Sequence, residues 1–319
     1  MKVLVTGSAG FIGFHLSKVL LERGDEVIGI DNFNDYYDVQ LKEDRNKMLE
    51  GYEKFKLYRV DISDLDSLRK VFEENGIEKV CNLAAQAGVR YSIDNPYVYG
   101  ESNLVGFVNI ISLCKENGIK NFVYASSSSV YGDGEKFPCN ELDDTDHPIS
   151  LYAATKRANE LIAYTYNHLY GMRTIGLRFF TVYGPWGRPD MAIFKFAQKM
   201  VKGEEIPVFN FGKDMKRDFT YVDDIVDGVV KALDCDYECE IFNLGKGDPD
   251  ELGEMISLIE KHMDIEAKKN LLPMQQGDVL ITYSDTSKAK KMLKYIPKVT
   301  LDEGIEKFVE WFKGYYMVK

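Results

Sequence analysis

Short apolar runs alternate with helix-period segments through the first half of this chain, and no other feature constrains the fold as strongly. A short apolar run is typical of a strand buried on both faces, and parallel strands need a crossover, usually a helix, between them. The alternation therefore predicts an α/β protein with a doubly wound parallel sheet. The expected strands are residues 2–6, 26–31, 56–60, 79–83, 121–126 and 174–179, and the expected helices are residues 11–23, 65–75, 97–117 and 150–170.

A glycine-rich turn, residues 7–13 (GSAGFIG), connects the first expected strand to the first expected helix. Glycines let backbone amides approach a diphosphate, and the helix N-terminus adds partial positive charge. The second expected strand ends at Asp31, where a carboxylate accepts hydrogen bonds from an adenosine ribose and repels the extra phosphate of NADP. These features predict a Rossmann domain that binds NAD, although an Asp that merely begins a turn would look the same. The expected contacts are Gly7, Gly10, Phe11, Ile12, Gly13, Asp31 and Asn32.

The texture of the sequence changes after residue 179, where elements become shorter and loops contain more Gly, Pro and aromatic residues. Residues 183–189 (YGPWGRP) are an example. Such loops commonly shape a binding cleft. We expect residues 1–178 to form the dinucleotide-binding domain and residues 179–319 a smaller substrate-binding lobe. Residues 222–244 have the pattern of a helix followed by a strand, so this segment is expected to return to the first sheet.

Charge and composition exclude several classes of function. The 51 acidic residues outnumber the 40 basic ones, and the formal charge of -11 disfavours nucleic acid or an anionic membrane as partner. The five cysteines and four histidines are scattered without the spacing of a metal or redox site. No segment has the length and apolarity of a membrane span or a secretion signal. We therefore expect a cytoplasmic protein without a metal.

A tyrosine and a lysine stand four residues apart in the last expected helix of the first half. Tyr152 and Lys156 therefore lie on one helix face. Chemistry at a sugar hydroxyl needs a base near neutral pH, and a neighbouring Lys and a nicotinamide ring both favour the phenolate. An ordinary surface pair would show the same spacing, so the surrounding motifs must decide between the two interpretations.

A serine run, residues 125–132 (ASSSSVYG), lies at the carboxyl edge of the expected sheet, where doubly wound folds bind ligands. Together with the glycine turn and the Tyr152–Lys156 pair, it closely resembles the extended short-chain dehydrogenase/reductases that act on nucleotide sugars. The resemblance covers essentially the whole chain. It implies Tyr152 as catalytic base, Lys156 as ribose ligand, Ser127 as catalytic hydroxyl, and a homodimer paired through the long helices. It also implies cofactor contacts at Asp61, Ile62, Leu83, Ala84, Ala85 and Asn103.

The residues after Ser127 bear on the type of reaction. The similar 4,6-dehydratases carry an Asp-Glu pair there, whereas this chain has Ser128 and Ser129. Neither hydroxyl is a competent acid or base at neutral pH, so dehydration is disfavoured. The expected reaction is oxidation of a sugar at C4, turning of the 4-keto sugar, and return of the hydride to the opposite face.

The identity of the sugar depends on finer segments. Residues 87–92, 178–191 and 276–279 resemble those of UDP-glucuronate 4-epimerases. Arg188 is expected to bind the C6 carboxylate, with Thr181 and the hydroxyls of Ser127, Ser128 and Ser129 completing an anion pocket; a surface salt bridge is the alternative for Arg188. By resemblance alone, the remaining substrate contacts are Arg90, Val208, Phe209, Arg217 and Asp278.

Three other functions stay open. A UDP-glucuronate decarboxylase would release the carboxylate of the 4-keto intermediate, but its family differs in the segment that here spans residues 84–90. A UDP-glucose 4-epimerase is the other enzymatic alternative. Gln275 and Gln276 stand where glucose-type epimerases place arginine, which leaves the contacts to the substrate diphosphate open. An NAD-sensing regulator would retain the fold, yet such proteins usually lose the tyrosine–lysine pair.

Overall fold

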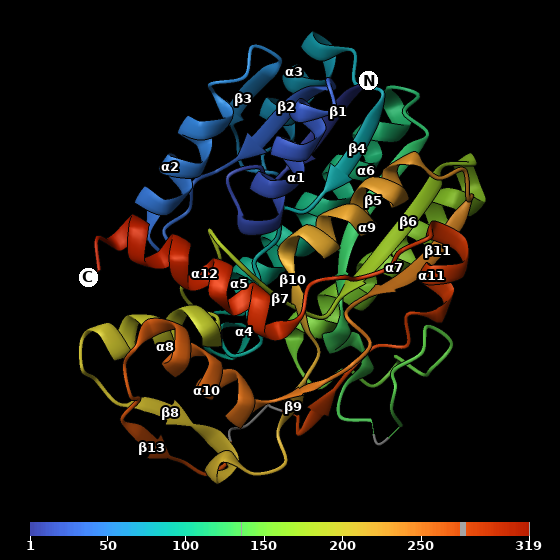
Figure 1. The fold of residues 1–319 in the computed structure, drawn as a ribbon. Coiled ribbons are helices and arrows are strands. Elements are labelled where there is room, and N and C mark those ends of the chain that lie inside the picture. Colours follow the sequence, from blue (N-terminus) through green and yellow to red (C-terminus); the bar gives the residue numbers. More distant parts are fainter. Residues whose placement is uncertain (135, 275–278, 319) are drawn as a thin grey trace.

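A seven-stranded parallel sheet forms the centre of the protein, whose structure is a computed structural model that describes residues 1–134, 136–274 and 279–318 (Figure 1). The strand order is β11-β6-β5-β4-β1-β2-β3. The order reverses between β1 and β4, which is where sheets of this kind bind ligands. The strands are β1 (Lys2–Thr6), β2 (Glu26–Asp31), β3 (Phe55–Arg59), β4 (Lys79–Asn82), β5 (Asn121–Ser127), β6 (Arg173–Phe179) and β11 (Cys239–Leu244).

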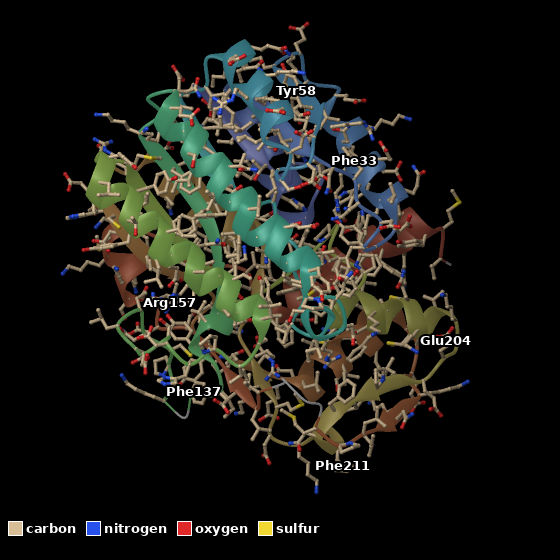
Figure 2. All side chains as sticks on the ribbon, turned by 180° about the vertical axis from the view of Figure 1, so that it is seen from behind. Phe33, Tyr58, Phe137, Arg157, Glu204 and Phe211 are labelled. Carbon is tan, nitrogen blue, oxygen red and sulfur yellow. The ribbon has the colours of Figure 1, made fainter. Side chains whose placement is uncertain are left out.

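Helices cover both faces of this sheet, so the predicted doubly wound fold is confirmed. Alternate residues of each strand point to opposite faces, and Val3 and Val5 join one apolar core while Leu4 joins the other. The first core is covered by α1 (Phe11–Glu22), α2 (Val39–Leu49) and α9 (Val222–Asp234), and the second by α3 (Leu65–Asn75), α6 (Gly106–Glu116) and α7 (Leu151–Tyr170). Seen from behind, α6 and α7 lie side by side on the outer surface (Figure 2).

The later part of the chain adds small sheets and helices at one end of the central sheet, where α8, α10, β8 and β13 group together (Figure 1). Segment 222–244 contains α9 and β11, and β11 pairs in parallel with β6 at the sheet edge. The division at residue 178 stays a prediction. The remaining strands are β7 (Thr181–Tyr183), β8 (Ile206–Val208), β9 (Lys216–Arg217), β10 (Phe219–Tyr221), β12 (Asp250–Glu251), β13 (Lys269–Leu271) and β14 (Ile281–Thr282). The remaining helices are α4 (Tyr91–Asp94), α5 (Tyr97–Tyr99), α8 (Ala192–Val201), α10 (Leu252–Met263), α11 (Ser287–Leu293) and α12 (Leu301–Tyr316).

Two helical regions differ from the sequence-based expectation. The helix expected over residues 97–117 is divided into α5, a π-helical segment η1 (Gly100–Val105) and α6. A π-helical turn inserts one extra residue, and such turns are frequent at functional sites. Helix α2 was not expected, because its buried positions include the polar Lys42, Arg45 and Asn46. Within the described residues, no helix is long and apolar enough to cross a membrane.

Candidate active site

The glycine turn between β1 and α1 folds so tightly that its glycine positions leave no room for a side chain. Gly7 has a φ of +70°, and a Cβ placed on Gly13 would lie 2.0 Å from the Gly7 carbonyl oxygen. The Gly10 amide donates to that same carbonyl at 2.9 Å, and α1 begins at the next residue, Phe11. The backbone and the N-terminus of α1 thus form a cradle of the size and polarity that suits a diphosphate.

Asp31 is the last residue of β2; its side chain is buried and hydrogen-bonds to the glycine turn. Its Oδ2 accepts from the Ala9 amide at 3.1 Å and its Oδ1 from the Phe33 amide at 2.9 Å. Burial raises the pKa of Asp31, while the Phe33 amide and Lys42 oppose that rise. A carboxylate has about four acceptor positions, so two remain for a ribose diol. Beside it, Asn32 donates to Asp61 Oδ2 at 2.6 Å.

The segment after β4 lies against the glycine turn. The amides of Leu83 and Ala84 donate to Thr6 Oγ1 at 3.1 and 3.0 Å, and a Cβ on Gly7 would approach the Ala84 nitrogen to 3.0 Å. Leu83 and Ala84, two of the residues predicted to contact the cofactor, therefore lie along one edge of the turn, and Ala85 follows them in the chain. Their role stays a prediction.

Asn103 braces this segment from the π-helical turn. Its Oδ1 accepts from the Gln86 amide at 2.8 Å, and its Nδ2 donates to the Gln86 carbonyl and to Thr155 Oγ1, both at 3.0 Å. The buried amide is thus used by the protein itself. Ile62 similarly packs on the neighbouring helix, where Gly106 leaves room for it. These contacts place both residues behind the predicted cofactor site.

Lys156 and Tyr152 lie one turn apart on α7, which begins after Ser150 caps it by accepting from the Ala153 amide. Lys156 Nζ donates to the Ala125 carbonyl at 2.9 Å and lies 6.0 Å from the Tyr152 ring centre. Burial lowers the pKa of Lys156 to about 8. The Lys156 ammonium is therefore buried, and it lies next to β5 and the Tyr152 phenol.

Opposing effects act on the pKa of the Tyr152 phenol. Desolvation raises its pKa, whereas the Ser127 hydroxyl and the positive charge of Arg188 lower it. Ser127 ends β5, and its Oγ lies 3.1 Å from Ser129 Oγ. The structure thus brings together Ser127, Tyr152 and Lys156 at the carboxyl end of the sheet, as the sequence predicted. The geometry suits a phenol that exchanges a proton with a bound hydroxyl group.

A buried ion pair fixes this arrangement from behind, and sequence reasoning missed it. Glu160, one turn beyond Lys156 on α7, accepts from Ser126 Oγ at 2.6 Å and from Arg178 Nε and Nη2, both at 2.8 Å. Ser126 and Arg178 are register partners on β5 and β6. Glu160 therefore fastens the helix that carries Tyr152 to the strand that carries Ser127. The sequence did contain a signal for Glu160, because Tyr152, Lys156 and Glu160 are spaced four residues apart and so lie on one face of α7.

Arg188 has a carboxylate partner within the chain. Its Nε and Nη2 donate to the two oxygens of Asp190 at 3.0 and 2.5 Å, and the Tyr36 hydroxyl donates to Asp190 at 3.1 Å. The guanidinium is close enough to Tyr152 to lower the pKa of the phenol. The structure thus places Arg188 near the predicted reaction centre, already bound in the bidentate manner that a substrate carboxylate would use.

The other predicted substrate residues are distributed over several elements. The Arg90 guanidinium lies 5.0 Å from the Phe209 ring centre, and Val208 is buried next to it in β8. Arg217 donates to the Val279 and Leu280 carbonyls at 2.5 and 2.7 Å. The remaining predicted contacts are Thr181, which begins β7, Ser128, which begins a 3-10 turn after β5, and Asp278, which lies outside the described residues.

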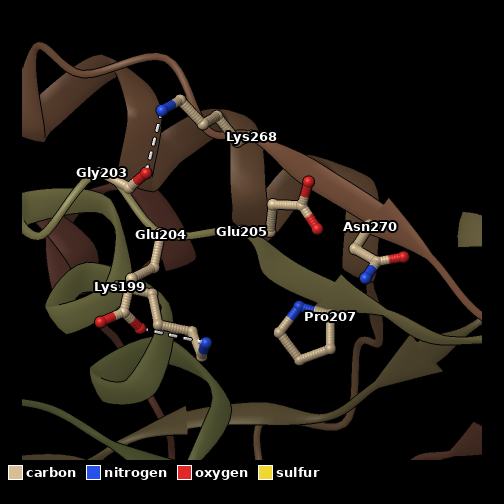
Figure 3. Close-up of a pocket in the computed structure, with 7 residues that line it drawn as sticks. All are labelled: Lys199, Gly203, Glu204, Glu205, Pro207, Lys268 and Asn270. Carbon is tan, nitrogen blue, oxygen red and sulfur yellow. Dashed lines mark hydrogen bonds and ion pairs between the residues drawn. The ribbon is translucent and has the colours of Figure 1, made fainter.

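A cavity of about 570 Å³ lies between α8, β8 and β13 (Figure 3). None of the predicted site residues lines it. Lys199 forms an ion pair with Glu204 at 3.3 Å, and Lys268 donates to the Gly203 carbonyl at 3.0 Å. This cavity is therefore separate from the residues predicted for catalysis and binding.

Comparison with known proteins agrees with this geometry. UDP-glucuronate 4-epimerase 4 of Arabidopsis thaliana is 48% identical over 332 residues, covering 98% of this chain and 76% of the plant protein. The structure of Bacillus cereus UDP-glucuronic acid 4-epimerase with UDP-glucuronic acid and NAD matches with a TM-score of 0.92 and 35% identity, covering 99% of this chain and 100% of that chain. A UDP-glucose 4-epimerase from Thermotoga maritima with UDP-glucose matches with a TM-score of 0.90 and 31% identity, over 99% and 100% of the two chains.

The family assignment follows from a match over most of the chain. The NAD dependent epimerase/dehydratase family matches residues 3–245, which include the glycine turn, Ser127, the Tyr152–Lys156 pair and Arg188. The two solved structures named above have the same fold over nearly their whole length. The family predicted from the sequence is thereby confirmed: the chain belongs to the NAD dependent epimerase/dehydratase family.

Proposed function

We propose that this protein interconverts UDP-glucuronate and UDP-galacturonate by NAD-dependent epimerisation at C4. The observation that carries the proposal is the grouping of Ser127, Tyr152 and Lys156 beside the glycine turn, with Arg188 close enough to act on the Tyr152 phenol. The plant relative and the Bacillus cereus structure, both named for this activity, support the same substrate.

Different residues of the chain bind the cofactor and act on the sugar. The glycine turn and Asp31 hold NAD, which when bound supplies the hydride acceptor at C4 and later the hydride donor. Tyr152 takes the proton from the O4 hydroxyl during oxidation and returns a proton to O4 during reduction. Ser127 holds that oxygen next to the phenol, and Lys156 keeps positive charge near the phenolate as it forms.

The carboxylate of the sugar needs a firm binding site. A C4 ketone makes glucuronate a β-keto acid, and such an acid loses carbon dioxide when the carboxylate bond aligns with the carbonyl. Arg188, Thr181 and the hydroxyls of Ser128 and Ser129 are proposed to hold the carboxylate away from that alignment. Because Asp190 occupies Arg188, the substrate carboxylate must displace Asp190 or bind the edge of the guanidinium that Asp190 leaves uncovered.

The same ion pair favours UDP-glucose as a second candidate substrate. Paired with Asp190, Arg188 presents little net charge to the site, and a neutral C6 hydroxyl needs none. The Thermotoga maritima structure with UDP-glucose has the same fold. The two candidates differ in one measurable quantity, which is the dependence of turnover on Arg188.

Parallel kinetics of Arg188→Ala on both sugars test the assignment. A buried charge left without its partner costs roughly 2–5 kcal/mol, so turnover of UDP-glucuronate is expected to fall about 30-fold to several-thousand-fold. Turnover of UDP-glucose is expected to fall much less, and the fraction of decarboxylated 4-keto-pentose is expected to rise. Arg69→Ala, which removes an exposed ion pair with Glu116, serves as control. Equal losses on both sugars would show that Arg188 does not bind the carboxylate.

We also propose that two copies of the chain pair through α6 and α7. Both helices lie on the outer surface seen in Figure 2, and each carries or adjoins apolar side chains that are exposed. Apolar groups at this density commonly mark a protein interface. The exposed residues are Val105 at the end of η1, Val108 on α6, and Leu161 and Tyr164 on α7.

A further inference from the structure

Arg45 is a fully buried arginine on α2 that contacts two loops from distant parts of the sequence. Its Nη1 donates to the Ala9 carbonyl in the glycine turn at 2.9 Å and to the Tyr37 hydroxyl at 2.8 Å. Its Nη2 donates to the carbonyls of Trp186 at 2.6 Å and of Gly187 at 3.1 Å. One side chain thus joins the predicted cofactor loop to the loop that ends at Arg188.

The charge of Arg45 is not neutralised by an ion pair. Among the described residues, no carboxylate lies within 4.0 Å of its guanidinium, and its Nε has no hydrogen-bond partner. Asp31 is near enough for Arg45 to lower the pKa of its carboxyl, which burial raises. Buried charges in proteins are normally paired or bind a charged ligand. The positive charge therefore remains available to an anion at the glycine turn.

The second loop held by Arg45 is strained. Trp186 has a φ of +58°, a left-handed conformation that is unfavourable for a bulky side chain and persists only where the surroundings enforce it. Hydrogen bonds enforce it here, from Arg45 to the carbonyls of Trp186 and Gly187 and from His15 to the carbonyl of Pro185 at 3.0 Å. Arg188 follows directly, so its position depends on these contacts.

We propose that Arg45 is a positioning residue that fixes the cofactor loop and the Arg188 loop relative to each other and supplies positive charge to the diphosphate of the dinucleotide. The part that concerns the sugar rests on the proposed function. The part that concerns the dinucleotide does not. Loss of Arg45 is expected to weaken dinucleotide retention and sugar binding together, because one guanidinium serves both loops.

The experiment compares Arg45→Lys with the wild type and with Arg69→Lys, a matched change at an exposed arginine far from both loops. NAD affinity is measured by titration of stripped protein, and KM and kcat with whichever UDP-sugar the wild type turns over. Tryptophan fluorescence gives a readout independent of activity. The chain has two tryptophans, and Trp186 lies against Trp311 with ring centres 5.3 Å apart. The signal therefore reports on the Arg188 loop itself.

Arg45→Lys is expected to weaken NAD binding roughly 10- to 100-fold, to raise the KM of the sugar more than it lowers kcat, and to change tryptophan emission. Unchanged NAD affinity and emission overturn the proposal, as does a loss of NAD affinity with an unchanged KM. A wild type that turns over no UDP-glucuronate contradicts the proposed function alone, because the NAD and fluorescence measurements still apply. If Arg45→Lys does not fold, Tyr37→Phe, which removes one acceptor of Arg45, replaces it, and wild-type NAD affinity and emission in Tyr37→Phe overturn the proposal.

Discussion

Tyr152, the proposed proton acceptor, has a pKa that its surroundings raise. Desolvation raises the pKa, while Ser127 and Arg188 lower it and so limit the rise. Tyr152→Phe removes the exchangeable proton but little volume. We expect this variant to keep its fold and its NAD and to lose about 10²–10⁴ in turnover. Ser127→Ala is expected to lose less, because Ser129 offers a second hydroxyl.

The measurement for Tyr152→Phe is single-substrate kinetics together with NAD released by acid from the purified protein. Near-normal epimerisation with full NAD content would assign the base to another residue. Loss of NAD together with activity would instead indicate that Tyr152 holds the cofactor rather than the proton.

Lys156 is expected to destabilise the cofactor-free protein at neutral pH. Burial lowers its pKa to about 8 from an ordinary value of 10.5. Between these two pH values the unfolded chain holds a proton that the folded chain lacks, so stability rises with pH in that window. Below pH 8 the full penalty applies, at most about 3 kcal/mol. Lys156→Met should therefore raise the free energy of unfolding at pH 7 and raise it much less at pH 10.

Urea denaturation of stripped protein at both pH values checks this expectation, with Lys70→Met, a change at an exposed lysine, as control. If Lys156→Met raises the free energy of unfolding equally at both pH values, packing and not the buried charge causes the increase. The accompanying loss of activity would show that the destabilising charge is retained for function.

Helices α6 and α7 show how an element can serve two partners at once. Their inner faces pack on the sheet, while Leu161 and Tyr164 on α7 are 54% and 61% exposed. Leu161→Glu places a charge in the proposed interface and is expected to convert a dimer into single subunits. Analytical ultracentrifugation measures this. Met48→Glu on α2, at a position 43% exposed on the opposite side of the sheet, is the control. A wild type that sediments as a single subunit would contradict the proposed dimer.

Dinucleotide binding is expected to stabilise the whole molecule, because the glycine turn, α2 and the segment after β4 meet at one site. A ligand at 100 times its Kd adds about 2.7 kcal/mol to the free energy of unfolding. NAD should raise the melting temperature more than NADP does, since the buried Asp31 carboxylate repels a 2′-phosphate. Thermal unfolding with each cofactor tests this. Asp31→Asn should reduce the difference between the melting temperatures measured with NAD and with NADP. A larger shift with NADP would overturn this interpretation of Asp31.

Local patterns in the sequence were enough to predict the strands of the sheet and most of the helices that cover it. Strands buried on both faces leave apolar runs, and the expected run at residues 121–126 differs from β5 by one residue. Helix α2 escaped prediction because it buries Lys42 and Arg45, whose partners are supplied by other segments. The π-helical turn at Gly100–Val105 escaped for a related reason, since Asn103 there bonds to Gln86 and Thr155.

The sequence by itself determined the strands of the central sheet and placed Tyr152 and Lys156 on one helix face, because strand burial, glycine turns and residue spacing are all local properties. Only the tertiary structure decided what those residues touch. Arg45 contacts Ala9, which is 36 positions away in the sequence, and Trp186, which is 141 positions away. The Glu160–Arg178 pair joins a helix to a strand. It also placed Asp190 on Arg188, a pairing that depends on the path of one loop. Such contacts form because buried charges need partners wherever the fold brings them.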